Sequence, residues 1–128
     1  RKTMKTIIFD TETTGLTNAD EIVELAITDS QGKQMYLQRF KPTEQIHPGA
    51  SRVTGITNEM LDDEPTFADE YDKIVEIFES CTKAQAYNAS FDIRMLKQTC
   101  KKYNLFTDFI ETVEFECVMA MYNNYEYN

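Results

Sequence analysis

The sequence has little of what membrane-spanning, disulfide-linked and zinc-binding proteins require. No apolar run approaches the roughly 18 residues that a membrane-spanning helix needs. The chain has three cysteines and one histidine, and Cys81, Cys100 and Cys117 show no Cys-x-x-Cys spacing. This pattern disfavours a disulfide framework and a zinc site, so we expect buried thiols. Internal repeats and low-complexity linkers are also absent, and the sequence predicts a single-domain, cytoplasmic protein without membrane contact.

Basic residues are few as well. The chain has 13 Lys and Arg against 22 Asp and Glu, for a formal net charge of -9. This balance argues against broad electrostatic binding to a phosphate backbone. It does not exclude a nucleic-acid enzyme, because a metal site needs clustered carboxylates and bound dications offset part of their charge. With 41% hydrophobic and 27% charged residues, the composition is that of a globular domain.

Hydrophobic patterning predicts three strands first, then alternating helices and strands. Strands are expected over residues 6–10, 21–29 and 33–40, with a hairpin turn at Gln31-Gly32. Short loops between successive strands favour an antiparallel meander. A fourth, weaker strand is expected over residues 84–87. The prediction is an α/β fold with a mixed sheet, an antiparallel three-strand start and flanking helices.

Capping signals predict where the helices begin. Thr66, followed three residues later by Asp69, predicts a helix to about residue 80. Thr57 or Asn58 is expected to start a short helix inside a polar loop, and Ser90 to cap a helix that ends near residue 103. The remaining expectations are the polar loop over residues 41–64, an ambiguous stretch over 105–113, a last helix over 114–122 and a loop over 122–128.

The most distinctive local feature is Phe9-Asp10-Thr11-Glu12-Thr13-Thr14-Gly15-Leu16. Residues two apart on a strand point to the same face, so Asp10 and Glu12 are expected to project side by side. Adjacent carboxylates repel each other unless a cation lies between them, and Mg²⁺ prefers such oxygen ligands. Gly15 allows a backbone to come close to a ligand, and the threonines offer donors. The alternative is a solvated acidic strand end.

A second feature is Tyr87-Asn88-Ala89-Ser90-Phe91-Asp92-Ile93. It places Asp92 in the first turn of an expected helix, near the positive end of the helix dipole. Taken alone it has a simple structural explanation, because aspartate is common in first helical turns. Phe91 would then be a core residue.

Together with residues 46–61 (IHPGASRVTGITNEML), the two features resemble the DEDD exonuclease family. The similarity is to the proofreading, epsilon-type subunit of bacterial DNA polymerase III and its relatives, over residues 5–122. It implies an RNase H-like exonuclease fold and metal-dependent 3′–5′ removal of nucleotides from DNA ends, with release of nucleoside monophosphates. The implied partner is a single-stranded DNA 3′ end, or RNA, with a DNA polymerase subunit as a further candidate.

The resemblance also implies roles for single residues. Asp10, Glu12 and Asp92 match the catalytic residues that hold two Mg²⁺ or Mn²⁺ ions. The stretch that cradles the 3′-terminal nucleotide is matched by Thr13, Thr14, Gly15 and Leu16. Asn88 and Phe91 flank the second-motif aspartate and are expected to position it and the substrate strand. Thr54 replaces a histidine that contacts substrate in many relatives, although its hydroxyl can still donate to a phosphate or sugar.

The family also needs a fourth carboxylate and a general base, from a C-terminal motif of His or Tyr followed by Asp, and the sequence lacks it in the expected place. Tyr103 and Asp108 mimic the spacing but follow Asp92 too closely. His47 lies in a proline-containing loop, where a solvated side chain is expected. We therefore expect residues 1–128 to be one exonuclease domain, incomplete at its C-terminus and weakly active or inactive alone.

Two other functions remain open at this stage. One is an RNase of the same fold that degrades oligonucleotides. The other is a non-catalytic nucleic-acid-binding module that keeps the fold without the fourth carboxylate. Activity on DNA and RNA oligonucleotides separates the first from a DNA exonuclease, and metal binding by Asp10→Ala tests whether the predicted site exists.

Overall fold

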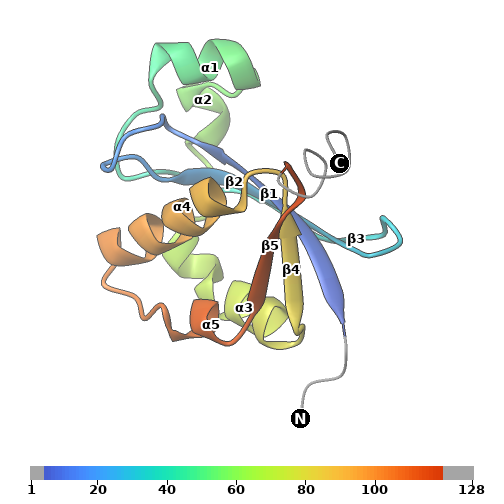
Figure 1. Ribbon diagram of the computed structural model, residues 1–128. Helices are drawn as coiled ribbons and strands as arrows, with labels where there is room; N and C mark the ends of the chain where they lie inside the picture. The colour runs from blue at the N-terminus through green and yellow to red at the C-terminus, as the bar shows by residue number, and fades with distance from the viewer. Residues whose placement is uncertain (1–4, 120–128) are drawn as a thin grey trace.

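A computed structural model describes residues 5–119 as a five-stranded sheet with helices packed against it (Figure 1). The strand order is β3-β2-β1-β4-β5. Pairing is antiparallel from β1 to β3 and parallel from β1 through β4 to β5, so the sheet is mixed, as predicted. The elements are β1 (Thr6–Thr13), β2 (Ile22–Asp29), β3 (Gln34–Arg39), α1 (Pro48–Thr54), α2 (Asn58–Leu61), α3 (Phe67–Glu79), β4 (Lys83–Ala86), α4 (Ala89–Lys102), α5 (Asp108–Glu111) and β5 (Glu114–Cys117).

The central strand β1 alternates between two faces of the sheet. Ile7, Phe9, Thr11 and Thr13 are buried, whereas the residues between them are exposed or half-buried. The strand is longer than the predicted 6–10, because Thr11 and Thr13 bury polar side chains where apolar ones would have marked a strand. The same strand therefore carries core residues and two of the predicted site residues, Asp10 and Glu12.

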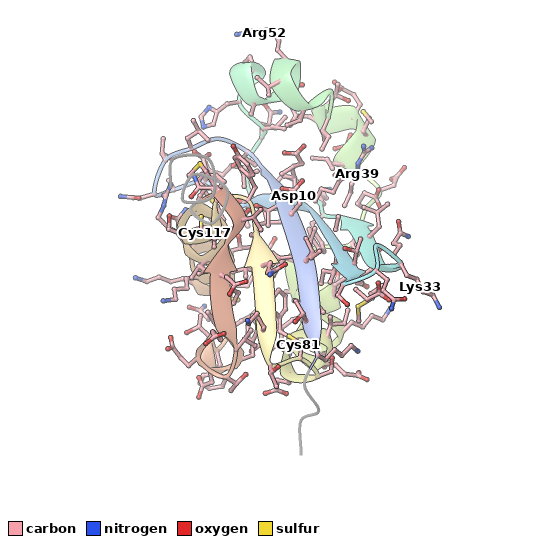
Figure 2. The ribbon with its side chains drawn as sticks, turned by 45° about the vertical axis from the view of Figure 1, so that its right-hand side comes forward. Asp10, Lys33, Arg39, Arg52, Cys81 and Cys117 are labelled. Carbon is pink, nitrogen blue, oxygen red and sulfur yellow. The ribbon has the colours of Figure 1, made fainter. Side chains whose placement is uncertain are left out.

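The main core lies between one face of the sheet and helices α3, α4 and α5. Phe9 of β1 packs edge-to-face against Phe78 of α3, with ring centroids 5.4 Å apart, and against Phe115 of β5 at 5.8 Å. Other members of this core are Ile7, Leu25, Ile27, Ile74, Cys81, Met95, Leu96, Cys100 and Phe109. Helix α4 packs across the sheet and contacts β1, β2, β4 and β5. The opposite face is exposed at Asp10 and at Leu37, which is 52% exposed (Figure 2).

Helices α1 and α2 lie at one end of the sheet, away from the main core (Figure 1). They join it through a small apolar cluster of Val23, Ile46, Ile56 and Leu61. Thr57 caps α2 by accepting from the backbone N–H of Met60, which confirms one of the two predicted starts. Helix α1 was predicted as loop. It has Pro48 in its first turn and ends at Gly55, whose φ of 77° suits glycine.

Local capping chemistry explains which other boundaries agree with the prediction. Thr66 and Asp69 form the expected capping box at the start of α3. The residue that caps α4 is Asn88, and not the predicted Ser90.

The predicted helix over residues 114–122 is wrong at its start. Residues Glu114–Cys117 instead form β5, because they pair in parallel with β4, which satisfies their backbone groups. Phe115 packs against the core, and Glu116 accepts from Gln85 at 2.6 Å. The loop predicted over 122–128 lies outside the described residues.

Candidate active site

Asp10 and Glu12 project from the same face of β1, as the strand period requires. Asp10 is exposed and Glu12 is half-buried. Partial desolvation raises the pKa of Asp10, a backbone hydrogen bond from Thr11 lowers it, and the charge of Glu24 raises it again. Desolvation also raises the pKa of Glu12, and the charges of Asp10, Glu24 and Asp92 add to the effect. The carboxylates therefore lie close enough to repel one another.

Asp92 reaches this cluster from the first turn of α4 and is only 5% exposed. The Thr11 hydroxyl donates a hydrogen bond to Asp92 Oδ1 at 2.5 Å and so ties the start of α4 to β1. Burial raises the pKa of Asp92 to about 6. The hydrogen bond from Thr11 opposes this shift, and the charge of Asp10 adds to it. The structure thus brings the three predicted carboxylates close enough to influence one another. Two of them come from β1 and one from α4, and the hydrogen bond that joins these elements links residues 81 positions apart.

Sequence reasoning missed a fourth acidic residue, Glu24. It lies directly opposite Glu12 in the β1–β2 pairing and raises the pKa of both Glu12 and Asp10. An ion pair with Arg39 Nε at 2.8 Å offsets part of its charge. The loop of residues 14–21 joins β1 to β2 and is no tight hairpin turn, and the register shifts at a bulge between Glu12 and Thr13, so local sequence does not give this pairing.

The donor set suits a hard dication by its chemistry. Carboxylate oxygens are the ligands that Mg²⁺ and Mn²⁺ prefer, and a dication would relieve the repulsion that raises these pKa values. Within residues 5–119, however, no three His, Cys, Asp or Glu side chains are grouped closely enough to hold a metal ion by themselves. Asp108, the fourth-carboxylate mimic, lies in α5, and the site carboxylates show no influence from it.

A cavity of about 510 Å³ opens beside Glu12. We call it the nucleotide cleft, after the ligand that is proposed for it below. Its lining consists of Glu12, Gly15, Leu16 and Thr17 from the end of β1 and the following loop, Gly49, Ala50, Val53 and Thr54 from α1, and Asp20 and His47. Leu16 and Val53 are 76% and 87% exposed, so two apolar side chains border a solvent-open space. Such a space can accept a flat ring between its walls.

The other predicted substrate residues are placed differently. Thr13 and Thr14 are buried, and their hydroxyls donate to Gly15 O at 2.7 Å and to Asp20 Oδ1 at 2.8 Å. Neither lines the nucleotide cleft. The Thr54 hydroxyl lines it but already donates to Ala50 O at 2.9 Å.

Asn88 and Phe91 lie at the start of α4 beside Asp92, outside the lining of the nucleotide cleft. Asn88 is exposed and accepts from Ser90 Oγ at 3.2 Å. Phe91 packs against the main core, and Arg94 lies over its ring at 5.5 Å from the centroid. These contacts agree with a role in holding the first turn of α4.

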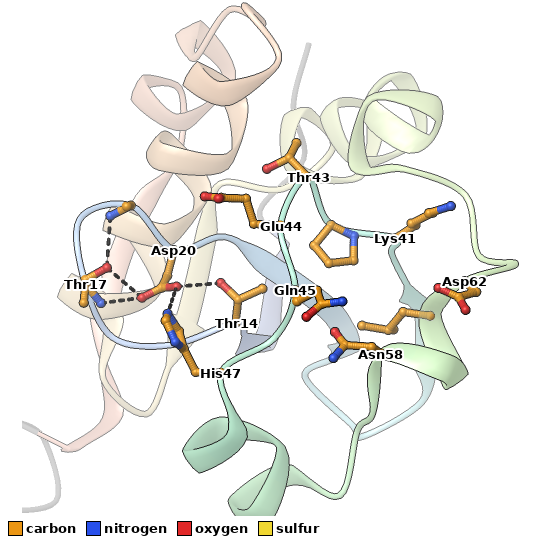
Figure 3. A pocket seen from close by; sticks show the side chains of 13 residues that line it. Thr14, Thr17, Asp20, Lys41, Thr43, Glu44, Gln45, His47, Asn58 and Asp62 are labelled. Carbon is orange, nitrogen blue, oxygen red and sulfur yellow. Dashed lines mark hydrogen bonds and ion pairs between the residues drawn. The ribbon is translucent and has the colours of Figure 1, made fainter.

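His47 is exposed in its loop, as expected, with 61% of its side chain accessible. What the sequence did not indicate is its contact with Asp20: His47 Nε2 lies 3.1 Å from Oδ1 of this buried side chain. Figure 3 shows this pair in the lining of a second cavity, of about 780 Å³. Sequence patterns gave no signal for the pair, because its partners are 27 positions apart and neither lies on a periodic element.

These features define a class, since the sheet order and the carboxylates on its central strand are those of an RNase H-like nuclease domain. The chain belongs to the exonuclease family, whose model matches residues 7–127. Solved structures of exonuclease I agree in fold. One with a bound inhibitor has a TM-score of 0.78 at 19% identity, over 94% of this chain and 30% of that chain. Escherichia coli exonuclease I with a dA16 oligonucleotide has a TM-score of 0.76 at 21% identity, over 91% and 28%.

Similar sequences include exonucleases and polymerase subunits. An uncharacterised exonuclease of Escherichia phage 186 is 37% identical over 93% of this chain and 62% of its own length. The PolC-type DNA polymerase III of Thermotoga maritima is 35% identical over 75% of this chain and 7% of its own length. The epsilon subunit of Buchnera aphidicola DNA polymerase III is 32% identical over 86% and 53%. The chain spans less than two thirds of the length of each of these relatives. Their names confirm the predicted resemblance to proofreading exonucleases.

Among the described residues, no helix has the length and apolar character needed to cross a membrane.

Proposed function

We propose that the protein hydrolyses phosphodiester bonds at the 3′ end of a DNA strand and releases nucleoside monophosphates. The observation that carries the proposal is that Asp10, Glu12 and Asp92 lie close enough for their charges to raise one another's pKa values, while Glu12 also lines an open cleft. Membership of the exonuclease family and similarity to epsilon subunits support this reading. A polymerase subunit is the partner that these relatives suggest.

Asp10, Glu12 and Asp92 would hold Mg²⁺ or Mn²⁺, with further oxygen ligands from the substrate phosphate and water. The ions would supply charge stabilisation at the attacking and leaving oxygens and a water of lowered pKa. Thr11 orients Asp92 through its short hydrogen bond, so that this carboxylate faces β1. Leu16 and Val53 would flank the terminal base, and Gly15 would line the cleft beside them.

Binding and hydrolysis test this proposal separately. Calorimetric titration with Mn²⁺, with and without a nucleoside 5′-monophosphate, should show binding that strengthens with nucleotide and is lost in Asp10→Ala. A 5′-labelled single-stranded DNA should shorten stepwise from its 3′ end in the presence of Mn²⁺, and an RNA of the same sequence should shorten more slowly. Equal binding by wild type and Asp10→Ala would refute the site assignment. Faster digestion of RNA would make the protein an RNase of the same fold.

A non-catalytic binding module is the second candidate, and one observation favours it. The described residues hold no group of three potential ligands that can enclose a metal ion. This candidate predicts that single-stranded DNA binds, that Mn²⁺ has no effect on the binding and that no mononucleotide is released. Release of mononucleotides abolished by Glu12→Gln would exclude it.

A further inference from the structure

Helix α1 forms one wall of the nucleotide cleft without having a core of its own. It has seven residues, and none of them is buried. Ala50 alone packs, partly buried, against the small cluster of Val23, Ile46, Ile56 and Leu61. Since apolar burial is the main force that fixes a helix in place, the position of α1 depends on the contacts at its ends.

The opposite wall, formed by the β1–β2 loop, is held firmly from α4. Arg94 donates to Leu16 O at 3.1 Å and to Asn18 Oδ1 at 3.0 Å. Gln98 Nε2 donates to Asp20 O at 2.9 Å and to Thr17 O at 3.2 Å. This loop therefore moves with the rigid α4–sheet unit, and α1 is the less constrained of the two walls.

Asp20 is the point at which the two walls meet. Its side chain is 5% exposed and accepts four hydrogen bonds or ion-pair contacts. Three come from its own loop: Thr14 Oγ1 at 2.8 Å, Thr17 N at 2.8 Å and Thr17 Oγ1 at 2.7 Å. The fourth comes from His47 Nε2 at 3.1 Å, in the residue that precedes α1 (Figure 3). Burial acts to raise the pKa of Asp20, but these hydrogen bonds and His47 hold it below its usual value, so the acceptor is ionised.

Gly15 allows this approach. A Cβ at position 15 would lie 2.5 Å from His47 Cδ2 and 2.6 Å from Asp20 Oδ2. The backbone of His47 adds a second link, because its N–H donates to Thr14 O at 2.9 Å. The imidazole thus packs directly on the segment expected to cradle the terminal nucleotide.

We propose that His47 is a positioning residue: its contact with Asp20 fixes α1 against the β1–β2 loop and thereby sets the width of the nucleotide cleft. The proposal rests on the function proposed above. His47 touches no reacting atom in this role, and its removal acts on substrate affinity through the wall that it holds. Its side chain makes no helix-capping bond, so a substitution leaves the cap of α1 unchanged.

A matched pair of variants tests this role. His47→Ala removes the donor to Asp20, whereas His47→Gln keeps an amide N–H at a similar reach. In Mn²⁺ and a single-stranded DNA substrate, His47→Ala should raise KM about fivefold to tenfold, the loss expected for one polar contact with a charged group, with kcat within about twofold of wild type. His47→Gln should restore KM to within about twofold of wild type.

Amide hydrogen exchange gives a readout that needs neither metal nor activity. In the metal-free chain, the amides of residues 51–55 should exchange about fivefold to tenfold faster in His47→Ala than in wild type, and at the wild-type rate in His47→Gln. Unchanged exchange in His47→Ala would overturn the proposal. Faster exchange with unchanged KM would also overturn it, because α1 would then be anchored by His47 without affecting substrate. Faster exchange in a protein that releases no nucleotide would instead refute the proposed function and leave the anchoring role standing.

Discussion

Burial of Asp92 should make the metal-free protein less stable as the pH rises. The carboxyl has a pKa of 3.8 in its unperturbed state and of about 6 in the fold, so the folded state holds its proton more tightly than the unfolded state. The stabilisation from this group is therefore fully present below pH 3.8 and is lost as the pH rises through about 6. A dication bound at the site would remove much of this loss, because it favours the ionised form.

The magnitude follows from the same two pKa values. Relative to the fully protonated state, the raised pKa of Asp92 lowers the free energy of unfolding by about 1–2 kcal/mol at pH 5 and by about 3 kcal/mol at pH 8. Asp92→Asn removes the titration and keeps an oxygen that can accept from the Thr11 hydroxyl. We expect the stability of the variant relative to wild type to increase by about 1–2 kcal/mol between pH 5 and pH 8. Any fixed cost of the buried amide cancels in this difference.

Urea denaturation in EDTA at several pH values between 5 and 8 measures this difference, with two-state behaviour checked by two probes. Asp63→Asn, at an exposed position outside the site, controls for the loss of one negative charge. If the difference in free energy of unfolding between Asp92→Asn and wild type is the same at pH 5 and pH 8, the reasoning is refuted. Mn²⁺ should stabilise wild type more than Asp92→Asn, and equal stabilisation would show that Asp92 is no ligand.

Three further predictions concern Gly15, the cap of α3 and Arg39. Gly15→Ala should destabilise the protein by about 1–3 kcal/mol, because the added methyl group overpacks against the His47 ring, and by less in a His47→Ala background. If urea denaturation gives the same loss of stability in both backgrounds, the His47 ring is not what the methyl group meets. Thr66→Ala should lower the stability of the protein by about 1 kcal/mol, because it removes the capping box of α3, whereas Thr66→Ser should keep most of the stability that the cap contributes. Thermal denaturation of both variants measures the difference. Arg39→Gln should tighten Mn²⁺ binding at pH 8 by roughly twofold to fivefold, because Glu24 loses its compensating charge; weaker binding by calorimetry would contradict this.

Features with local causes were predictable from the sequence. The Thr66 and Asp69 capping box and the Thr57 cap depend on residues three positions apart, and both predictions are confirmed. The pairing of Asp10 and Glu12 on one face follows from the strand period alone. The mixed, helix-flanked sheet followed from the order of strands and helices, and the family resemblance agreed with it.

Features that arise from non-local contacts were missed. Helix α1 buries no residue, so it has no hydrophobic periodicity by which it could be found. Strand β5 has only four residues, and its pairing with β4 decides its conformation more than its own propensity does. Glu24 and His47 join the site through strand register and through a loop contact, respectively, and neither is encoded in neighbouring residues. The roles of the predicted site residues remain predictions that the variants above test.

The alternation of β1 ties the predicted site carboxylates and the core residues to a single register. Phe9 and Thr11 face the helices while Asp10 and Glu12 face away, so inserting or deleting one residue in this strand would exchange the two sets. The carboxylates would then enter the core as Phe9 became exposed. Evolution can relocate the acidic pair along β1 only in steps of two, and each step would change its partner on β2 and its distance from α4. A related sequence that keeps the buried positions of this strand therefore also keeps the positions at which acidic side chains can project from the opposite face.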